Sequence, residues 1–457
     1  MITAREGAAV RRADSGNGED GGNGTREGAG VPGGGGGGGE GAGGDGADRT
    51  GEADGAPQGP DSWAPAIVSS EPGTFAYDVW HKRHPALFQR LKEALPYGPA
   101  RRDALDALLE ETLSGTLTPL PSDADEASLW NGPWDRGHYG KGWTEAPFLW
   151  AESYFYRRLR GATGYAYDGA GSGGTAGDRA WRGVDPFAPF KEAELVGSAV
   201  EGQLAALDTL EEALVDERTD ALLLGALWGN RADLGFLITA AESEGDRPLV
   251  ADDRDALRAL LRTTEERGGH VVLVADNAGR ELIPDLLLAA HLLDSGRAST
   301  LALHVKPHPY YVSDAVTSDV LAALRRIAAA PGAAGRAGHR LWAALEEGRL
   351  EIRTAAFSCA PLTYDAMPEA LRAEFASAAL TVFKGDLNYR RLVGDRHWAP
   401  TTPFADVTAY FPGPVAALRT LKSDVAVGLD AATVTALDGS GEAWRTNGAH
   451  ALIHVRD

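Results

Sequence analysis

Short apolar runs alternate with stretches of helical periodicity from residue 266 to residue 457. The runs, each a predicted strand, lie at 268–276, 299–305, 380–383, 424–429 and 451–455. A helical pattern at 281–293 follows the first of them directly. Strands separated by helices are typical of βαβ units, and continuously apolar strands are typical of sheets buried on both faces. The fold class predicted for residues 266–457 is therefore α/β, a mostly parallel sheet flanked by helices (α/β/α).

The region before residue 266 lacks this alternation. Apolar residues recur at helical spacing, which predicts helices at 103–109, 187–214 and 252–267, and no strand is expected between 75 and 265. A Gly-rich interruption at 161–183 is predicted to be a surface loop. Residues 73–265 are therefore predicted to form a mainly helical region.

Residues 1–72 form a Gly-rich tail. Its first 60 residues contain 22 glycines and only four large apolar side chains. Because fixing the backbone costs roughly 1–2 kcal/mol per residue, so little apolar surface cannot stabilise a fold. The tail is predicted to be disordered, with a binding tail as the alternative.

Composition excludes several classes of function. The chain has 65 acidic and 44 basic residues, a net charge of −21, which argues against binding to nucleic-acid backbones. Cys359 is the single cysteine, so neither an internal disulfide nor a Cys-rich zinc or iron–sulfur site is expected. No apolar run reaches the ~20 residues that a bilayer requires, and no secretory signal is visible at the amino terminus. We expect a soluble cytoplasmic protein that binds neither nucleic acid nor membrane; the sequence does not indicate its oligomeric state.

Polar side chains follow three of the predicted strands. Asp276 and Asn277 follow the first strand, Asp314 ends the loop after the second, and Asp386 follows the third. Open α/β sheets bind ligands beyond the carboxyl ends of their strands. Two carboxylates and one amide oxygen, from Asp276, Asn277 and Asp314, form an oxygen set suited to Mg²⁺ or Mn²⁺. Helix capping is the alternative role for Asp276 and Asn277, and capping or solvent exposure is the alternative for Asp314.

Cations gather after the third strand. Lys384, Arg390 and Arg391 fall within eight residues and flank Gly385. Cations beside a carboxylate-bound metal are suited to phosphate oxygens, whereas a solvated positive face is the alternative. No GxxxxGK[ST] loop or GxSxG elbow is present, and GxGxxG spacing occurs only within the Gly-rich tail and the Gly-rich loop, not after a predicted strand, which argues against nucleotide binding and against a serine hydrolase.

These segments resemble the metal-dependent damage-control phosphatase family, some of whose members were first classified as acidic-residue (protein-glutamate) methyltransferases. The resemblance spans residues 75–457. It rests on Asp276-Asn-Ala-Gly with Glu281, on His304-Val-Lys-Pro with Val312-Ser-Asp314, and on Phe383-Lys-Gly-Asp-Leu-Asn-Tyr-Arg390. Weaker matches are Trp143-Thr-Glu-Ala-Pro-Phe with Glu152, Leu227-Trp-Gly-Asn230 with Asp233, and Arg419-Thr-Leu-Lys422, which resembles the RTxK signature of the sugar-phosphate subfamily.

The resemblance implies a divalent metal (Mn²⁺, Co²⁺, Ni²⁺ or Mg²⁺) held by Asp276, Asn277 and Asp314. It implies small-molecule phosphate esters as substrates, with fructose 1-phosphate and fructose 6-phosphate suggested by the RTxK match. The substrate contacts expected from it are Glu152, Asn230, Lys384, Asp386, Leu387, Asn388, Tyr389, Arg390 and Lys422.

The expected mechanism is attack by a metal-activated water on the phosphoryl group. Asp386 or Glu281 is expected to act as general base or leaving-group acid. Attack by Asp276 itself, through an aspartyl-phosphate, is the less favoured route.

Two alternative functions stay open at the level of sequence. One is an S-adenosylmethionine-dependent protein-glutamate (carboxyl) O-methyltransferase, although Asp276-Asn-Ala-Gly279 offers only one glycine where a Gly-rich cofactor loop is expected. The other is a non-catalytic scaffold that kept the fold.

Overall fold

The computed structural model describes residues 63–169, 179–229 and 249–457. The predictions of a disordered tail over residues 1–62, of the centre of the Gly-rich loop, and of a role for Asn230 and Asp233 fall outside these ranges. Among the described residues, no helix is long and apolar enough to cross a membrane.

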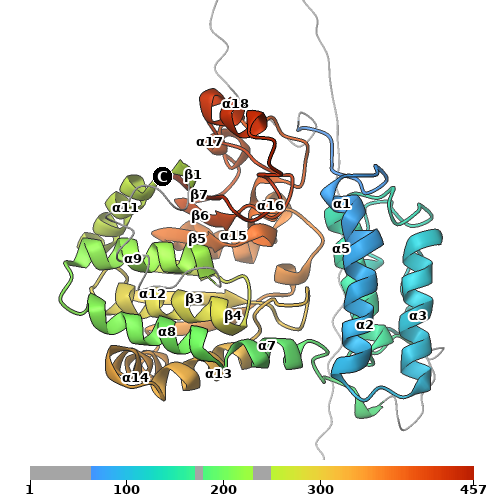
Figure 1. Cartoon of the computed structure of the whole chain (residues 1–457), viewed down its shortest axis with the longest axis horizontal. Coiled ribbons are helices and arrows are strands. Elements are labelled where there is room, and N and C mark those ends of the chain that lie inside the picture. The colour runs from blue at the N-terminus through green and yellow to red at the C-terminus, as the bar shows by residue number, and fades with distance from the viewer. Residues whose placement is uncertain (1–62, 170–178, 230–248) are drawn as a thin grey trace, which may run out of the picture. The chain divides into compact units, whose positions relative to one another are not determined.

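The first part of the described chain is helical. Its elements are α1 (Phe75–Asp78), the π-helix η2 (Val79–Arg83), α2 (His84–Ala94), α3 (Pro99–Ser114), α4 (Ala127–Trp130) and α5 (Phe148–Ala162). The segments α1, η2 and α2 follow one another without a break, and α3 packs beside both α2 and α5 (Figure 1). Large aromatic side chains fill this region: Trp130, Trp143 and Phe148 are buried, as expected for packing residues.

The sheet has seven strands in the order β1-β7-β6-β5-β2-β3-β4. The strands are β1 (Leu249–Asp252), β2 (His270–Val274), β3 (Thr300–Val305), β4 (Leu350–Thr354), β5 (Leu380–Lys384), β6 (Val415–Thr420) and β7 (Ala451–Arg456). Every neighbouring pair is parallel except β6 and β7. The predicted α/β class with a mostly parallel sheet is confirmed.

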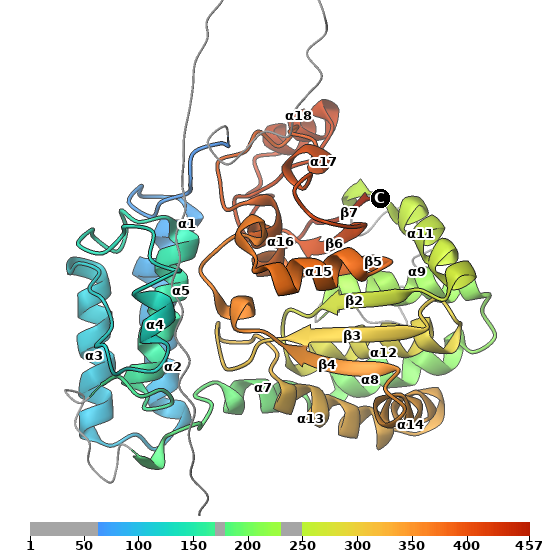
Figure 2. The same ribbon diagram turned by 180° about the vertical axis from the view of Figure 1, so that it is seen from behind.

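Helices cover both faces of the sheet. They include α7 (Ala188–Glu194), α8 (Ser198–Ala206), α9 (Val215–Trp228), α11 (Arg254–Arg267), α12 (Leu282–Asp294), α13 (Thr317–Ala328), α14 (Gly332–Glu346), α15 (Glu369–Ser377), α16 (Asp386–Val393), α17 (Phe404–Val407) and α18 (Ala431–Gly439). Short 3₁₀ helices lie among them, η4 (Leu207–Leu210), η6 (Gly279–Glu281), η7 (Ala356–Cys359) and η8 (Tyr364–Ala366). Figures 1 and 2 show α9 and α12 on one face of the sheet and α15 on the other.

The alternation of side chains along each strand produces two hydrophobic cores. On β2, Val271 and Leu273 pack with the helices of the α9 and α12 face. Val272 and Val274 point the other way and join the cluster that contains Phe375 of α15. Because successive strand residues face opposite sides, a continuously apolar strand is needed to fill both cores.

The strands differ from the sequence prediction at four places. The expectation of no strand between 75 and 265 is wrong, because β1 lies at 249–252; it is only four residues long and occupies a sheet edge. The strands β4 and β6 were not expected. Glu351 and Arg353 interrupt the apolar pattern of β4, and the apolar run of β6 is short, because Arg419 and Thr420 end it. The predicted strand at 424–429 does not form. Instead, the buried guanidinium of Arg419 donates hydrogen bonds to the backbone carbonyl oxygens of Ser423 and Val425.

The single helix predicted at 187–214 is also wrong. It is divided into α7, α8 and η4, because Gly197 adopts a φ of 124° that is incompatible with a helix. Residues 63–72, assigned to the tail, contact the folded region: Ala66 bridges Arg396, and Ile67 is buried. The division of the chain at residues 72 and 265 stays a prediction.

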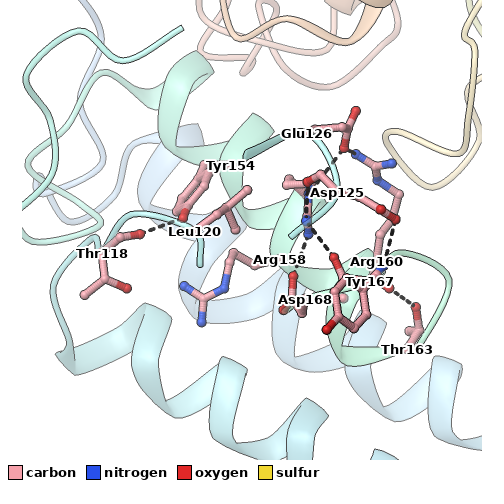
Figure 3. A network of polar contacts seen from close by, with 12 residues as sticks. Thr118, Leu120, Asp125, Glu126, Tyr154, Arg158, Arg160, Thr163, Tyr167 and Asp168 are labelled. Carbon is pink, nitrogen blue, oxygen red and sulfur yellow. Dashed lines mark hydrogen bonds and ion pairs between the residues drawn. The ribbon is translucent and has the colours of Figure 1, made fainter. Parts of the chain in front are cut away.

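A polar network ties α5 to the loop after β3. Glu126 is the one described non-glycine residue with a positive φ, 62°. Its carboxylate accepts hydrogen bonds from Arg160, as Figure 3 shows, and from His308 Nε2 at 2.7 Å. His308 lies in the loop that ends at Asp314, so this network anchors the loop to the helical region.

Candidate functional site

The sheet changes direction of winding between β5 and β2. The chain runs from β2 outward through β3 and β4, and later from β5 outward through β6 on the other side. Such a switch point opens a crevice at the carboxyl ends of the two central strands. Asp276 follows β2 and Gly385 follows β5, so the predicted edge and the switch point coincide.

Gly385 allows these two segments to approach closely. Its φ is +82°, and a Cβ built on it would lie 1.8 Å from Oδ2 of Asp276. Any other residue at position 385 would collide with that carboxylate. The glycine therefore brings the backbone after β5 against the side chain after β2.

The loops after β2 and β3 are joined by their backbones. Asn277 and Asp314 form an isolated antiparallel bridge, and the N–H of Ala315 donates to the carbonyl of Asp276 at 2.9 Å. The Asn277 amide donates to Oδ2 of Asp276 at 3.1 Å, and its oxygen accepts from Ser313 at 2.6 Å. The three residues predicted to bind a metal are thus brought together.

The two carboxylates of this set are buried and close to other negative charges. Burial, with Glu281 and Asp314 nearby, raises the pKa of Asp276 well above its usual value. Burial also raises the pKa of Asp314, against the opposing effect of Lys306, whose Nζ lies 3.7 Å from Oδ1. Oδ1 of Asp314 is buried without a hydrogen bond among the described residues. Paired buried carboxylates with an unsatisfied oxygen are stabilised by a bound cation.

The donor set therefore fits a hard divalent cation. The set would consist of two carboxylates and the Asn277 amide oxygen; within the described ranges no group of three or more His, Cys, Asp or Glu side chains is arranged to hold a metal. Oxygen ligands of this kind favour Mg²⁺ or Mn²⁺ over zinc.

A cavity of about 520 Å³ opens beside this cluster. Eight of the residues predicted from the sequence line it, namely Glu152, Asp276, Asn277, Asp314, Asp386, Leu387, Arg390 and Lys422. They come from the helical region and from the ends of β2, β3, β5 and β6. A cavity of this size accommodates a small metabolite.

Four other predicted residues do not line the cavity. The Lys384 ammonium lies 2.9 Å from Asp285 and donates to the carbonyl of Ala226. Asn388 donates to the backbone of Ala275 and accepts from Lys306. The remaining two, Tyr389 and Glu281, are buried against Arg419 and Asn277 respectively. These side chains support the cavity from behind.

Asp386 is oriented by its neighbours. Its Oδ1 accepts from Arg419 at 2.8 Å and from Ser423 at 3.1 Å. Burial acts to raise the pKa of Asp386, but the guanidinium groups of Arg419 and Arg390 hold this pKa below its usual value. The carboxylate therefore stays ionised at neutral pH, which does not suit it to donate a proton.

Glu152 and Arg390 form a second buried pair in the cavity wall. Arg390 binds Asp395 through two hydrogen bonds of 2.7 and 3.0 Å, and Glu152 lies farther from it, at 3.4 Å. Burial raises the pKa of Glu152 to about 7, although Arg390 opposes the shift.

We expect the stability of the protein to depend on pH through Glu152. Because its folded-state pKa lies above the ordinary value, its contribution is fully present at low pH and is lost as pH rises through about 7. Glu152→Gln should therefore gain stability relative to the wild type as pH rises from about 5 to about 8. Urea unfolding of both proteins across this range measures the difference; a difference independent of pH would contradict the assignment.

Sequence patterns did not reveal the wall contributed by the helical region. Arg83, Leu87 and Arg90 line the cavity from η2 and α2, and Tyr156 and Tyr311 lie opposite each other with ring centroids 4.4 Å apart. The spacing of Arg83, Leu87 and Arg90 places them on one helix face, and this spacing is the sequence pattern that could have indicated the wall.

The chain is similar to known proteins over most of its length. A family model described as the damage-control phosphatase ARMT1-like domain matches residues 79–437. The damage-control phosphatase ARMT1 of Mus musculus is 28% identical over 448 residues, which cover 85% of this chain and 98% of that protein. The damage-control phosphatase ARMT1 of Danio rerio is 28% identical over 440 residues, covering 83% and 94%. A solved DUF89 family protein from Pyrococcus horikoshii aligns with a TM-score of 0.43 and 14% identity, over 79% of this chain and 94% of that one.

Proposed function

Because the chain belongs to the ARMT1-like damage-control phosphatase family, we propose that it is a metal-dependent phosphatase that hydrolyses phosphate esters of small metabolites. Family membership supports phosphatase activity and disfavours the methyltransferase alternative. Sugar phosphates such as fructose 1-phosphate or fructose 6-phosphate are the proposed substrates. The cytoplasmic location stays a prediction.

One observation carries the proposal. Two buried carboxylates, Asp276 and Asp314, share a cavity with the cations Arg390 and Lys422 at the switch point of the sheet. Like charges are not buried together unless a cation or a proton compensates them. Cations facing a compensated carboxylate pair are suited to bind phosphate.

Asp276, Asn277 and Asp314 are the proposed ligands of a divalent metal. Such an ion would neutralise the two carboxylates and withdraw charge from a phosphoryl oxygen. Glycine at 385 keeps the space beside Asp276 free of a side chain.

The chain's own residues bind and orient the phosphate ester. Arg390, which Asp395 fixes in place, and Lys422 would donate to phosphoryl oxygens, where their interaction strengthens as charge develops. Glu152 is the better candidate for the proton donor than Asp386, since a pKa of about 7 allows Glu152 to hold a proton at neutral pH. Asp386 instead fixes the backbone N–H of Lys422, at 3.4 Å, and so helps to position that residue.

The proposal is tested by phosphate release from a panel of sugar phosphates with Mn²⁺ or Mg²⁺, and again after EDTA treatment. We expect release from at least one ester, loss of release with EDTA, and recovery when metal is restored. The same protein incubated with S-adenosylmethionine and a glutamate-containing peptide should transfer no methyl group. Methyl transfer that persists in EDTA, with no phosphate release under any metal, would overturn the proposal.

A further inference from the structure

One wall of the cavity is a single face of the helix formed by η2 and α2. Val79, Arg83, Leu87 and Arg90 all line the cavity, at spacings of four, four and three residues. Residues spaced in this way lie on one side of a helix. The wall therefore presents two apolar and two cationic side chains to whatever occupies the cavity.

Both arginines are held by aromatic rings instead of by acids. The guanidinium of Arg83 lies 4.5 Å from the ring centroid of Phe75, and that of Arg90 lies 4.5 Å from that of Phe190. Neither forms an ion pair or a side-chain hydrogen bond with any residue that the structure describes. The rings contact the faces of the guanidinium groups, so the N–H donors at the edges stay available.

His84, between them in the sequence, adds no charge to this wall. It is buried and stacks on Phe155 with centroids 3.8 Å apart. Burial lowers the pKa of His84 to about 3. The positive charge of the helical wall therefore comes from Arg83 and Arg90.

The other charges of the cavity are already matched. Arg390 is compensated by Asp395, and Asp386 by Arg419. Under the proposed function, Asp276 and Asp314 are compensated by a divalent metal. Lys422 and the N–H donors of Arg390 then serve the phosphate that is hydrolysed, while both arginines of the helical wall lack a negative partner among the described residues. Glu194 lies near Arg90 and Lys422 but is exposed and forms no ion pair with either among the described residues.

We propose that Arg83 and Arg90 form a subsite for a second anionic group, so that the preferred substrates are phosphate esters that also carry a distal phosphate or carboxylate. This inference rests on the proposed function, because it places the second group relative to the phosphate that is cleaved. The cavity of about 520 Å³ falls in the size range of pockets that hold small ligands.

The experiment compares substrates that differ by one anionic group. Fructose 6-phosphate and fructose 1,6-bisphosphate test a distal phosphate, and glucose 6-phosphate and 6-phosphogluconate test a distal carboxylate. Wild type, Arg83→Met, Arg90→Met and the double variant are assayed for kcat/KM with Mn²⁺. Methionine keeps an apolar stem over the ring and removes the charge. Lys82→Ala is the matched control, since Lys82 precedes Arg83, pairs with Asp78 and does not line the cavity.

We expect the wild type to favour, in at least one pair, the ester with two anionic groups over its counterpart with one. Each methionine variant should reduce that preference by about tenfold, chiefly through KM, because a charge-assisted hydrogen bond is lost. Lys82→Ala should retain the wild-type preference. Equal kcat/KM for both members of both pairs, or equal losses on both members in the methionine variants, would overturn the inference while leaving the proposed function intact.

If no ester is hydrolysed, that outcome counts against the proposed function. A binding measurement then tests whether Arg83 and Arg90 form the anion subsite. Calorimetric titration with fructose 1,6-bisphosphate and fructose 6-phosphate, in Mn²⁺, then provides the comparison. Tighter binding of the bisphosphate that disappears in the double methionine variant supports the subsite. Equal affinities, or no binding, contradict it.

Discussion

Asp276→Asn is expected to lower kcat for phosphate release by about a thousandfold or more, because it removes a proposed metal ligand from the cavity. Asp276 lies at the switch point of the sheet, with its carboxylate against the backbone of Gly385. Phosphate release with saturating Mn²⁺ measures the loss.

The same substitution should not destabilise the metal-free protein. Burial and neighbouring Glu281 and Asp314 raise the pKa of Asp276, so its ionised form opposes folding at neutral pH. Asparagine has nearly the same shape and no charge. In EDTA at neutral pH, we expect the free energy of unfolding of Asp276→Asn to equal or exceed that of the wild type.

Asp406→Asn is the matched control for this prediction. Asp406 is exposed on α17 and does not line the cavity. It should change neither activity nor stability appreciably. An active Asp276→Asn enzyme, or one that unfolds more readily in EDTA, would count against the proposed role of Asp276.

Lys384→Met should chiefly destabilise the fold, by about 3–5 kcal/mol, because it leaves Asp285 as a buried charge without its partner. Lys384 and Asp285 are each 1% exposed, and their charged atoms lie 2.9 Å apart. Asp285 raises the pKa of Lys384 despite its burial, which indicates that the ammonium is held as an ion. Chemical unfolding in EDTA measures the loss.

A double variant separates this role from phosphate binding. Lys384→Met with Asp285→Leu removes both charges, and it should recover most of the lost stability because no unpaired charge remains. If Lys384 instead binds substrate, the single variant will raise KM for the phosphate ester with little change in stability. That result would restore the role expected from the sequence.

The sequence was sufficient to predict that the polar side chains of the proposed site meet at one edge of the sheet. The apolar runs at 268–276, 299–305 and 380–383, which precede or end at these side chains, indicated parallel strands, and parallel strands bring their carboxyl ends to one edge. The structure confirms this arrangement, and Asp276, Asp314 and Asp386 line one cavity. Local patterns carry this information because a strand and the residue after it are adjacent in the chain.

Strand periodicity also predicts the side of the sheet that the Lys384 side chain faces, and the phosphate contact expected for Lys384 did not take it into account. Phe383 belongs to the core beneath α15, so the next residue of the strand faces the opposite side. There its partner is Asp285 of α12. Proximity to Gly385 in the sequence suggested a phosphate contact, whereas strand periodicity predicts burial between sheet and helix.

The wall of the cavity that the helical region contributes, in contrast, could not be predicted from local sequence patterns. Arg83 and Arg90 reach the cavity only because the helical region packs beside loops that are about 200 residues away in sequence. No local periodicity encodes such a contact. The same holds for the bond between Glu126 and His308, which anchors the loop of Asp314.

The central claim, that Asp276, Asn277 and Asp314 jointly bind a divalent metal, is tested most directly by Mn²⁺ titration followed by electron paramagnetic resonance. The account predicts one bound Mn²⁺ per wild-type chain and loss of that binding in Asp276→Asn, with Asp406→Asn unchanged. Undiminished Mn²⁺ binding by Asp276→Asn, or no binding by the wild type, would contradict it.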